Sequence, residues 1–471
     1  MIGSGIAGLS CASILSSSHD VTIFESMPTL GMDSHSINVP HRVSTPSPVA
    51  RLDVPLRIFV KQYYPELRAL FDYHGVRYQT VDVASSYCTG KGESLFHYRN
   101  LLLGRNGFSV PLLSSLGALL RPSFLANCVR VVWFIFNCGR NSVHARDALA
   151  SLTYKQYLQR EGFSPEFVDN IAIPMAALIC TCSYDSVAAY PAAVMVDYFA
   201  RSFMRWGGVQ RATGGARDVV SRLSVNCNVR LATPVDSVRK RASDGALLVR
   251  AVGQTRDDVF DDVVLATPAH IANTVLRDAD AVFATLLGAF KAEQSVTVCH
   301  RDPRLMPADR STWRSVNFIT VRPGEAPMAT IWVNRAISGF ENVEYDVFQT
   351  WNPLIEPAPE TVLSSSALWR PVVTHDTLDA LAKLDALQGR DRIWICGSWT
   401  RWGVPLLEQA ALSGIEVAEA IGPNRRPWPA TVRERHSSAY VDVIGLSFKL
   451  LWGAVALVIW ALLSAIVSPF L

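Results

Sequence analysis

The sequence predicts an α/β fold with a parallel sheet that is discontinuous along the chain, a second inserted α+β domain and a C-terminal transmembrane helix. Three observations predict it. A glycine-rich turn opens the chain, short apolar strands with the habit of a parallel sheet recur far apart, and a long uncharged run ends it. At 471 residues the chain is long enough for two or three domains.

The glycine-rich turn is Ile2 to Ser10, with glycines at 3, 5 and 8. Gly3 allows a tight turn, Gly5 lets the backbone approach a pyrophosphate, and Gly8 permits close packing of the helix on the sheet. The helix begins near Ile6 and Ala7, and its free N–H groups are suited to phosphates. We therefore expect a dinucleotide-binding turn of the Rossmann type.

A strand ending in an acid follows this helix. Val21 to Phe24 is apolar or β-branched, and Glu25 is placed to accept both hydroxyls of an adenosine ribose. Met1 stands directly against the motif, so the strand that should precede it is reduced to about two residues. Because the downstream elements look intact, we expect a truncated start rather than an inactive protein.

Charge and cysteine content exclude several classes. The net charge is +3 with 18% charged residues, which argues against a nucleic-acid binder held by phosphate contacts. The nine cysteines show no metal-ligand spacing, and we expect reduced, mostly buried thiols and no metal site. No basic, apolar leader precedes the glycine turn, so no secretory signal is expected.

The order of elements predicts a domain that is assembled from three pieces. Val263 to Ala266 is a fully apolar strand, and Arg392 to Gly397 is a last buried strand followed by a helix to Ile421. A turn at Asp244-Gly245 joins a strand pair. The expected units are a nucleotide-binding domain (1–84, 208–275 and 388–422), a substrate domain (85–207 and 276–387), a linker (423–442) and a transmembrane helix (443–470).

Residues 94–140 contain apolar blocks punctuated by glycine and proline, with arginines interleaved. The blocks are too short to span a bilayer. We expect a helical subdomain with a large buried face. The alternative is a surface that dips into lipid and delivers an apolar substrate.

The C-terminal run from Leu450 to Val467 carries no charge and is long enough to span a membrane. Arg425, Arg426, Arg433 and Arg435 precede it, so the positive-inside rule places the folded domain on the cytosolic side. A buried C-terminal helix is the competing interpretation. We expect a single-pass anchor with the catalytic domain facing the cytosol.

The chain resembles FAD-dependent oxidoreductases of the amine oxidase and phytoene desaturase superfamily, most of all the predicted NAD/FAD-binding branch of bacteria and fungi. The resemblance covers most of residues 1–422. It rests on the first turn with Glu25 and on these segments: Thr213 to Arg217, Thr233 to Val235, Val264 to Pro268, His300 to Asp302, Leu305 to Pro307, Trp332 to Arg335, Asn352-Pro353 and Cys396 to Trp399.

The resemblance implies FAD as cofactor, with its pyrophosphate over Gly3, Gly5 and Gly8 and its ribose on Glu25. It further implies a backbone contact from Val235 to the adenine region, Gly397 and Ser398 beside the ribityl–phosphate, and Glu408 to Gly414 near the isoalloxazine. Two departures stand out: Met32 replaces an expected glycine after Gly31, and Ser398 replaces a common acid.

Catalytic candidates are few, since a flavin takes the hydride itself and the protein supplies orientation. Trp399 and Trp402 match the aromatic wall of amine oxidases, although both are equally well explained as core residues. Lys291 could hold a water near the flavin N5, but a solvated lysine is the better interpretation. His300 with Asp302 is better explained as a structural pair.

The expected function is removal of a hydride from a C–N or C–C bond of an apolar, lipid-soluble small molecule. We expect the protein to act beside a membrane and not to bind nucleic acid. Two alternatives stay open. One is FAD-dependent double-bond isomerisation of an unsaturated lipid, and the other is a flavin-binding scaffold without turnover.

Overall fold

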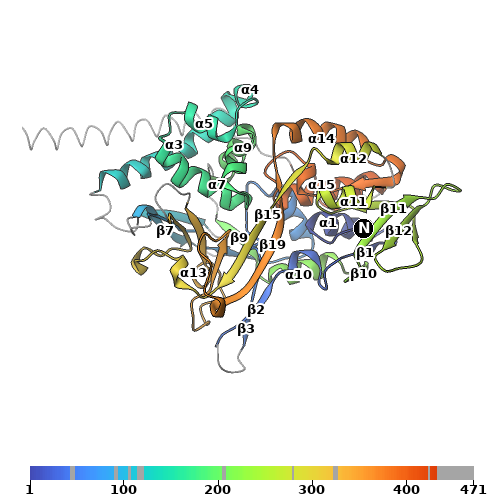
Figure 1. Ribbon diagram of the computed structural model, residues 1–471, viewed down its shortest axis with the longest axis horizontal. Coiled ribbons are helices and arrows are strands. Elements are labelled where there is room, and N and C mark those ends of the chain that lie inside the picture. Colours follow the sequence, from blue (N-terminus) through green and yellow to red (C-terminus); the bar gives the residue numbers. More distant parts are fainter. Residues whose placement is uncertain are drawn as a thin grey trace, which may run out of the picture.

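The computed structural model describes residues 1–42, 48–89, 94–103, 108–113, 121–203, 208–277, 281–321, 327–422 and 425–431. In Figure 1 one side holds the helices α1 (Ile6–Leu15), α11 (Ala269–Val275), α12 (Ala281–Leu287), α14 (His375–Leu387) and α15 (Leu407–Ile421). The other side holds α3 (Pro122–His144), α4 (Arg146–Leu149), α5 (Tyr154–Arg160), α7 (Ile173–Cys180) and α9 (Ala192–Phe203). The long strands β15 (Lys291–His300) and β19 (Val362–Val372) run between the two groups.

The first side is built on a parallel sheet assembled from distant segments. Strand β1 (Thr22–Phe24) pairs in parallel with β10 (Asn228–Arg230), and β14 (Val263–Leu265) pairs in parallel with β20 (Ile393–Ile395). Ile2 forms parallel bridges to both Phe24 and Leu265 and so joins the two pairs. Ile2 therefore lies between β1 and β14 in the sheet.

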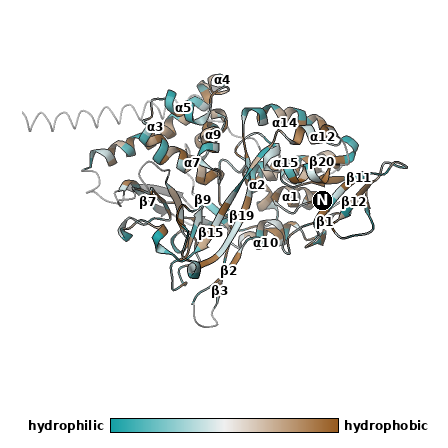
Figure 2. Ribbon diagram, in the orientation of Figure 1, coloured by the Kyte–Doolittle hydropathy of each residue, from teal (hydrophilic) through white to brown (hydrophobic). Residues whose placement is uncertain are grey.

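Two helices pack against each other beside this sheet. Helix α1 (Ile6–Leu15) is buried along almost its whole length, and α15 (Leu407–Ile421) lies against it. A Cβ at Gly414 would lie 2.1 Å from the carbonyl oxygen of Ala7, so only glycine permits this approach. Figure 2 shows α1 as mostly hydrophobic, as expected for a central helix.

The remaining elements of this side confirm several predicted segments. An antiparallel sheet contains β11 (Val235–Lys240), β12 (Leu247–Ala251) and β13 (Asp258–Phe260), with the predicted turn at Gly245. The flanking helices are α2 (Pro65–Tyr73), α10 (Gly215–Leu223), α11 (Ala269–Val275), α12 (Ala281–Leu287) and α14 (His375–Leu387). A small sheet has its strands in the order β4 (Phe59–Val60), β9 (Val209–Ala212), β5 (Tyr78–Val81). A separate pair is formed by β2 (Ile37–Pro40) and β3 (Val49–Leu52).

An eight-stranded sheet forms the centre of the other side, in the order β19-β15-β18-β17-β16-β6-β7-β8. Its strands are β6 (Ser85–Cys88), β7 (Ser94–Leu103), β8 (Phe108–Leu113), β15 (Lys291–His300), β16 (Val316–Ile319), β17 (Met328–Trp332), β18 (Phe348–Trp351) and β19 (Val362–Val372). Short helix α13 (Val333–Ala336) follows β17.

Helices from the middle of the chain cover this sheet. They are α3 (Pro122–His144), α4 (Arg146–Leu149), α5 (Tyr154–Arg160), α6 (Pro165–Phe167), α7 (Ile173–Cys180), α8 (Tyr184–Ala188) and α9 (Ala192–Phe203). The prediction of a purely helical subdomain over 94–140 is wrong for its first half, which forms the β7–β8 hairpin. Short apolar runs fit a strand and a buried helix equally well, and here cross-strand pairing decides.

The predicted transmembrane helix at 443–470 lies outside the described residues. Within the part of the chain that the structure describes, no helix combines the length and apolar character needed to cross a membrane. This finding contradicts the predicted membrane localisation, which we therefore correct.

Candidate active site

The glycine turn forms a cradle with two distinct kinds of glycine. A Cβ at Gly3 would lie 2.7 Å from the carbonyl oxygen of Ala266, and one at Gly8 would lie 2.3 Å from that of Gly3. These two glycines are required by packing. A Cβ at Gly5 would meet no protein atom within 4 Å and would project into a cavity that Gly5 lines. Gly5 therefore keeps space open for a ligand.

The start of α1 faces the same cavity. Gly5 is the N-cap of this helix, no side chain caps it, and Gly5, Ile6 and Ala7 line the cavity. Uncapped N–H groups at a helix N-terminus attract anions, and phosphates in particular. The cradle thus has the open space and the free N–H groups that a pyrophosphate needs.

Glu25 is buried at the end of β1 and held by its neighbours. Its Oε2 accepts hydrogen bonds from the backbone N–H (3.1 Å) and the hydroxyl (2.5 Å) of Ser4, and its Oε1 accepts from the N–H of Met27 (2.9 Å). These bonds fix the carboxylate beside the glycine turn, where a ribose of a bound dinucleotide would lie.

Ser4 is a site residue that sequence analysis missed. Its Oγ also accepts a hydrogen bond from the N–H of Gly31 (2.7 Å), and so connects the turn, Glu25 and the following loop. A Cβ at Gly31 would lie 2.4 Å from the carbonyl oxygen of Ser4. Gly31 is thus needed for close approach of the loop, while Met32 is buried and lines the cavity. A serine between two motif glycines is the signal that could have identified Ser4.

The ends of β14 and β20 supply the opposite wall of the cradle. Gly397 and Ser398 line the cavity, and the N–H of Gly397 donates to Ser413 Oγ at 2.9 Å. Trp399 also lines it, is buried against Phe290, and donates from Nε1 to the carbonyl oxygen of Thr267 at 3.1 Å. These residues follow the carboxyl ends of parallel strands, where ligands bind in open α/β sheets.

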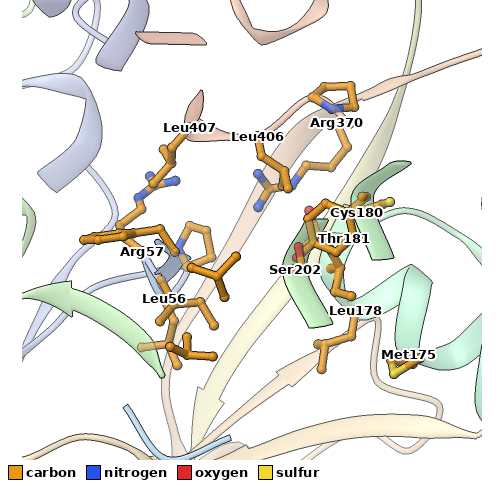
Figure 3. A pocket seen from close by; sticks show the side chains of 18 of the residues that line it. Leu56, Arg57, Met175, Leu178, Cys180, Thr181, Ser202, Arg370, Leu406 and Leu407 are labelled. Atoms are coloured by element: carbon orange, nitrogen blue, oxygen red, sulfur yellow. The ribbon is translucent and has the colours of Figure 1, made fainter. Parts of the chain in front are cut away.

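The cradle opens into one cavity of about 950 Å³ that extends to the helical side of the molecule. This volume is at the upper end of the range for ligand sites. Residues far from the cradle that line it are mainly apolar: Leu56, Tyr87, Phe96, Cys128, Val131, Val132, Ile135, Met175, Leu178, Phe318. Figure 3 shows Leu56, Met175 and Leu178 around this space.

Six predicted cofactor or wall residues lie outside the cavity lining: Gly3, Gly8, Glu25, Val235, Glu408 and Trp402. The carboxylate of Glu408 is buried and accepts from the backbone N–H groups of Glu66 (3.3 Å) and Leu67 (3.0 Å), at the start of α2. Glu408 therefore caps a helix. Val235 begins β11, close to Thr233, whose N–H donates to the carbonyl oxygen of Glu25. Trp402 packs against the core.

His300 serves the eight-stranded sheet. It is buried, its Nδ1 accepts from the N–H of Asp302 (3.1 Å), and its Nε2 is bonded to Thr350 Oγ1 (2.8 Å). Because Nδ1 accepts, the proton resides on Nε2. Burial lowers its pKa to about 4. With both nitrogens occupied and no place in the cavity lining, His300 is a structural residue.

Lys291 lies at the rim of the cavity, at the start of β15. Its side chain is exposed, and its Nζ donates to the carbonyl oxygen of Gly288 at 2.9 Å. The structure thus brings Gly5, Ile6, Ala7, Gly397, Ser398, Trp399 and Lys291 to one cavity.

Sequence analysis also missed two arginines that line the cavity, Arg57 and Arg370. Figure 3 shows their guanidinium groups on opposite sides of the same space. Burial, and then the charge of Arg57, lower the pKa of Arg370 to about 10, and burial also lowers the pKa of Arg57. Each arginine is the only positively charged residue in an apolar strand or loop. This isolated positive charge is the sequence feature that could have identified both arginines as site residues.

Comparison with known proteins supports the nucleotide-binding part. A family described as "NAD(P)-binding Rossmann-like domain" matches residues 1–74. A search of curated protein sequences gives no match.

Solved structures show the same fold over most of the chain. The conjugated-linoleic-acid (CLA)-producing fatty acid isomerase from P. acnes has a TM-score of 0.59 at 15% identity, and cyclohexylamine oxidase from Brevibacterium oxydans 0.57 at 13%. Putrescine oxidase bound to putrescine has a TM-score of 0.55 at 15% identity. Each comparison covers 89% of this chain and 97% of the other. The chain therefore shares the fold of these oxidases and of the isomerase over most of its length.

Proposed function

We propose that the protein is an FAD-dependent oxidoreductase that removes a hydride from a C–N or C–C bond of a small apolar molecule. One observation carries the proposal. A single cavity joins a dinucleotide cradle, with Gly5 facing open space, to a chamber walled by apolar side chains. Such a cavity has room for a cofactor and for a substrate next to it.

The residues of the cradle fit FAD. Gly5 and the start of α1 would hold the pyrophosphate, Glu25 the ribose, and Gly397 with Ser398 the ribityl–phosphate end. When bound, FAD supplies a reversible hydride acceptor. We further propose that residues 85–207 and 276–387 form the substrate domain, except for helices α12 and α14, which pack in the core of the nucleotide-binding side.

The chain itself would contribute orientation and exclusion of water. The apolar chamber walls favour an apolar substrate and disfavour bulk water. Trp399 provides a fixed aromatic surface at the junction of cradle and chamber, because its indole is held by Thr267 and Phe290. Lys291 at the rim is a candidate for holding a water near the reacting centre.

A second candidate is isomerisation of a double bond in an unsaturated lipid, in which the same hydride is taken and returned. The shared fold with a fatty acid isomerase and the apolar chamber favour this alternative. It differs from oxidation in leaving no net reduction.

Anaerobic absorbance spectroscopy tests both. Full-length protein loaded with FAD is mixed with fractionated lipids without oxygen. Bleaching of the flavin band followed by recovery in air supports an oxidase, and a product of unchanged mass without lasting bleaching supports an isomerase. Protein that retains FAD but changes no lipid or amine would refute both and favour a scaffold.

A further inference from the structure

Two arginines place positive charge inside the apolar cavity. The Nε and one terminal nitrogen of Arg370, and the Nε of Arg57, are inaccessible to solvent and have no hydrogen-bond partner. Arg370 lies over the ring of Trp351, with 5.2 Å between the guanidinium carbon and the ring centroid. Arg57 makes one long hydrogen bond, 3.5 Å, to the carbonyl oxygen of Met32.

The neighbouring carboxylates do not neutralise them. Among the described residues, no ion pair forms to Arg57 or Arg370. Asp53 accepts from Arg211 Nη2 (2.8 Å) and from the N–H of Ala216 (3.1 Å). Asp53 is therefore already paired, although its charge still raises the pKa of Arg57 by less than burial lowers it.

Two further carboxylates are also engaged elsewhere. Glu293 is opposite Arg370 in the β15–β19 register, but it accepts from the hydroxyls of Ser183 (3.0 Å) and Ser186 (2.7 Å). Asp82 lines the cavity and accepts from Ser315 Oγ at 2.8 Å. Neither compensates the arginine charges.

An unpaired guanidinium in a low-dielectric site is unfavourable, and two on opposite sides of one space repel each other. An anion between them would relieve both costs. A charge-assisted hydrogen bond from an arginine to a carboxylate is roughly twice as strong as one between neutral groups, so it favours a carboxylate over a hydroxyl.

We propose that the substrate is a long-chain carboxylic acid whose carboxylate is bound by Arg370, with Arg57 adding positive charge from the opposite wall. The apolar chain would lie along Leu178 and Met175 toward Val131 and Ile135 of α3, which line the same cavity. This inference deepens the proposed function by naming the class of substrate.

The same charges disfavour a protonated alkylamine, because its head group would lie between two cations. We therefore expect this protein to differ from a simple amine oxidase in its substrate and to act at a C–C or C=C bond. It also predicts an order of ligand affinity that needs no turnover.

Isothermal titration calorimetry of the FAD-loaded full chain tests the proposal with dodecanoic acid, dodecan-1-ol and dodecylamine, each below its micelle concentration. We expect the acid to bind at least about tenfold more tightly than the alcohol, and the amine most weakly. Arg370→Gln should remove the preference for acid over alcohol, and Arg370→Lys should retain part of it.

Arg301→Gln is the matched control, because Arg301 stands just beyond the end of β15, contacts Tyr345 and does not line the cavity. It should leave the ligand order unchanged. FAD content is measured by absorbance in every sample.

Equal binding of acid and alcohol by the wild-type protein would overturn the proposal. So would a preference that survives Arg370→Gln, or loss of FAD in that variant, which would assign the arginine to the cofactor. If Arg370→Gln does not fold, the wild-type ligand order and Arg370→Lys decide. Acid preference without any flavin reduction or isomerisation would defeat the proposed function. The carboxylate site at Arg370 would then stand as a binding site, with the acid as a ligand and not a substrate.

Discussion

Single glycines in the first turn have different physical roles, and these roles can be separated by substitution. Gly5 has an ordinary extended conformation, with φ −62° and ψ 173°, and its missing Cβ faces the cavity. Gly8 lacks space for a Cβ because the carbonyl oxygen of Gly3 is 2.3 Å away. A substitution at Gly5 therefore tests cofactor binding, whereas one at Gly8 tests packing.

Gly5→Ala should therefore lower FAD affinity by at least about tenfold, while the free energy of unfolding of the FAD-free protein changes by less than about 0.5 kcal/mol. FAD titration and chemical denaturation measure the two quantities. Gly8→Ala serves as the contrast, with an expected loss of about 1–3 kcal/mol in stability. Unchanged FAD binding in Gly5→Ala would argue against a pyrophosphate at this turn.

His300 predicts a pH dependence of stability. Its pKa is lowered to about 4 by burial, so between the unfolded value near 6.5 and pH 4 the unfolded chain binds a proton that the folded chain does not. The contribution of neutral His300 to the free energy of unfolding is therefore fully present above this pH range. It is lost progressively as the pH falls through the range. His300→Gln should reduce the slope by up to about 1.4 kcal/mol per pH unit, measured by denaturation from pH 4 to 7.

At the scale of elements, Glu408 connects α15 to the start of α2. Its buried carboxylate accepts two backbone N–H groups there, so Glu408→Ala should destabilise the protein by about 2 kcal/mol and leave FAD bound. Thermal unfolding followed with flavin absorbance measures both effects. The control is Glu416→Ala on the same helix, where the side chain is partly exposed and pairs with Arg401.

Elements with a local signal were predictable, and those decided by distant partners were not. The turn at Gly3 to Gly8 and the strand ending at Glu25 depend on neighbours in the sequence, and the structure places them together. The β7–β8 hairpin was missed because its apolar runs resemble a buried helix. The role of Glu408 was missed because its partners lie hundreds of positions away.

At the scale of the whole molecule, the cavity is lined by segments that are far apart in the sequence, between Gly5 and Ala410. The sequence indicated its cradle through glycine motifs, and its apolar character through composition. Arg57 and Arg370 escaped prediction because each is an isolated arginine, and only the fold brings them to one space. The cofactor could therefore be predicted from sequence motifs, whereas the substrate class could be inferred only from the tertiary structure.

The central claim is that this cavity holds FAD. The most direct measurement is the absorbance spectrum of the purified full chain after incubation with FAD and desalting. We predict a retained flavin band at about one FAD per chain, with FAD released on denaturation. A chain that is folded by circular dichroism yet retains no flavin would contradict the account.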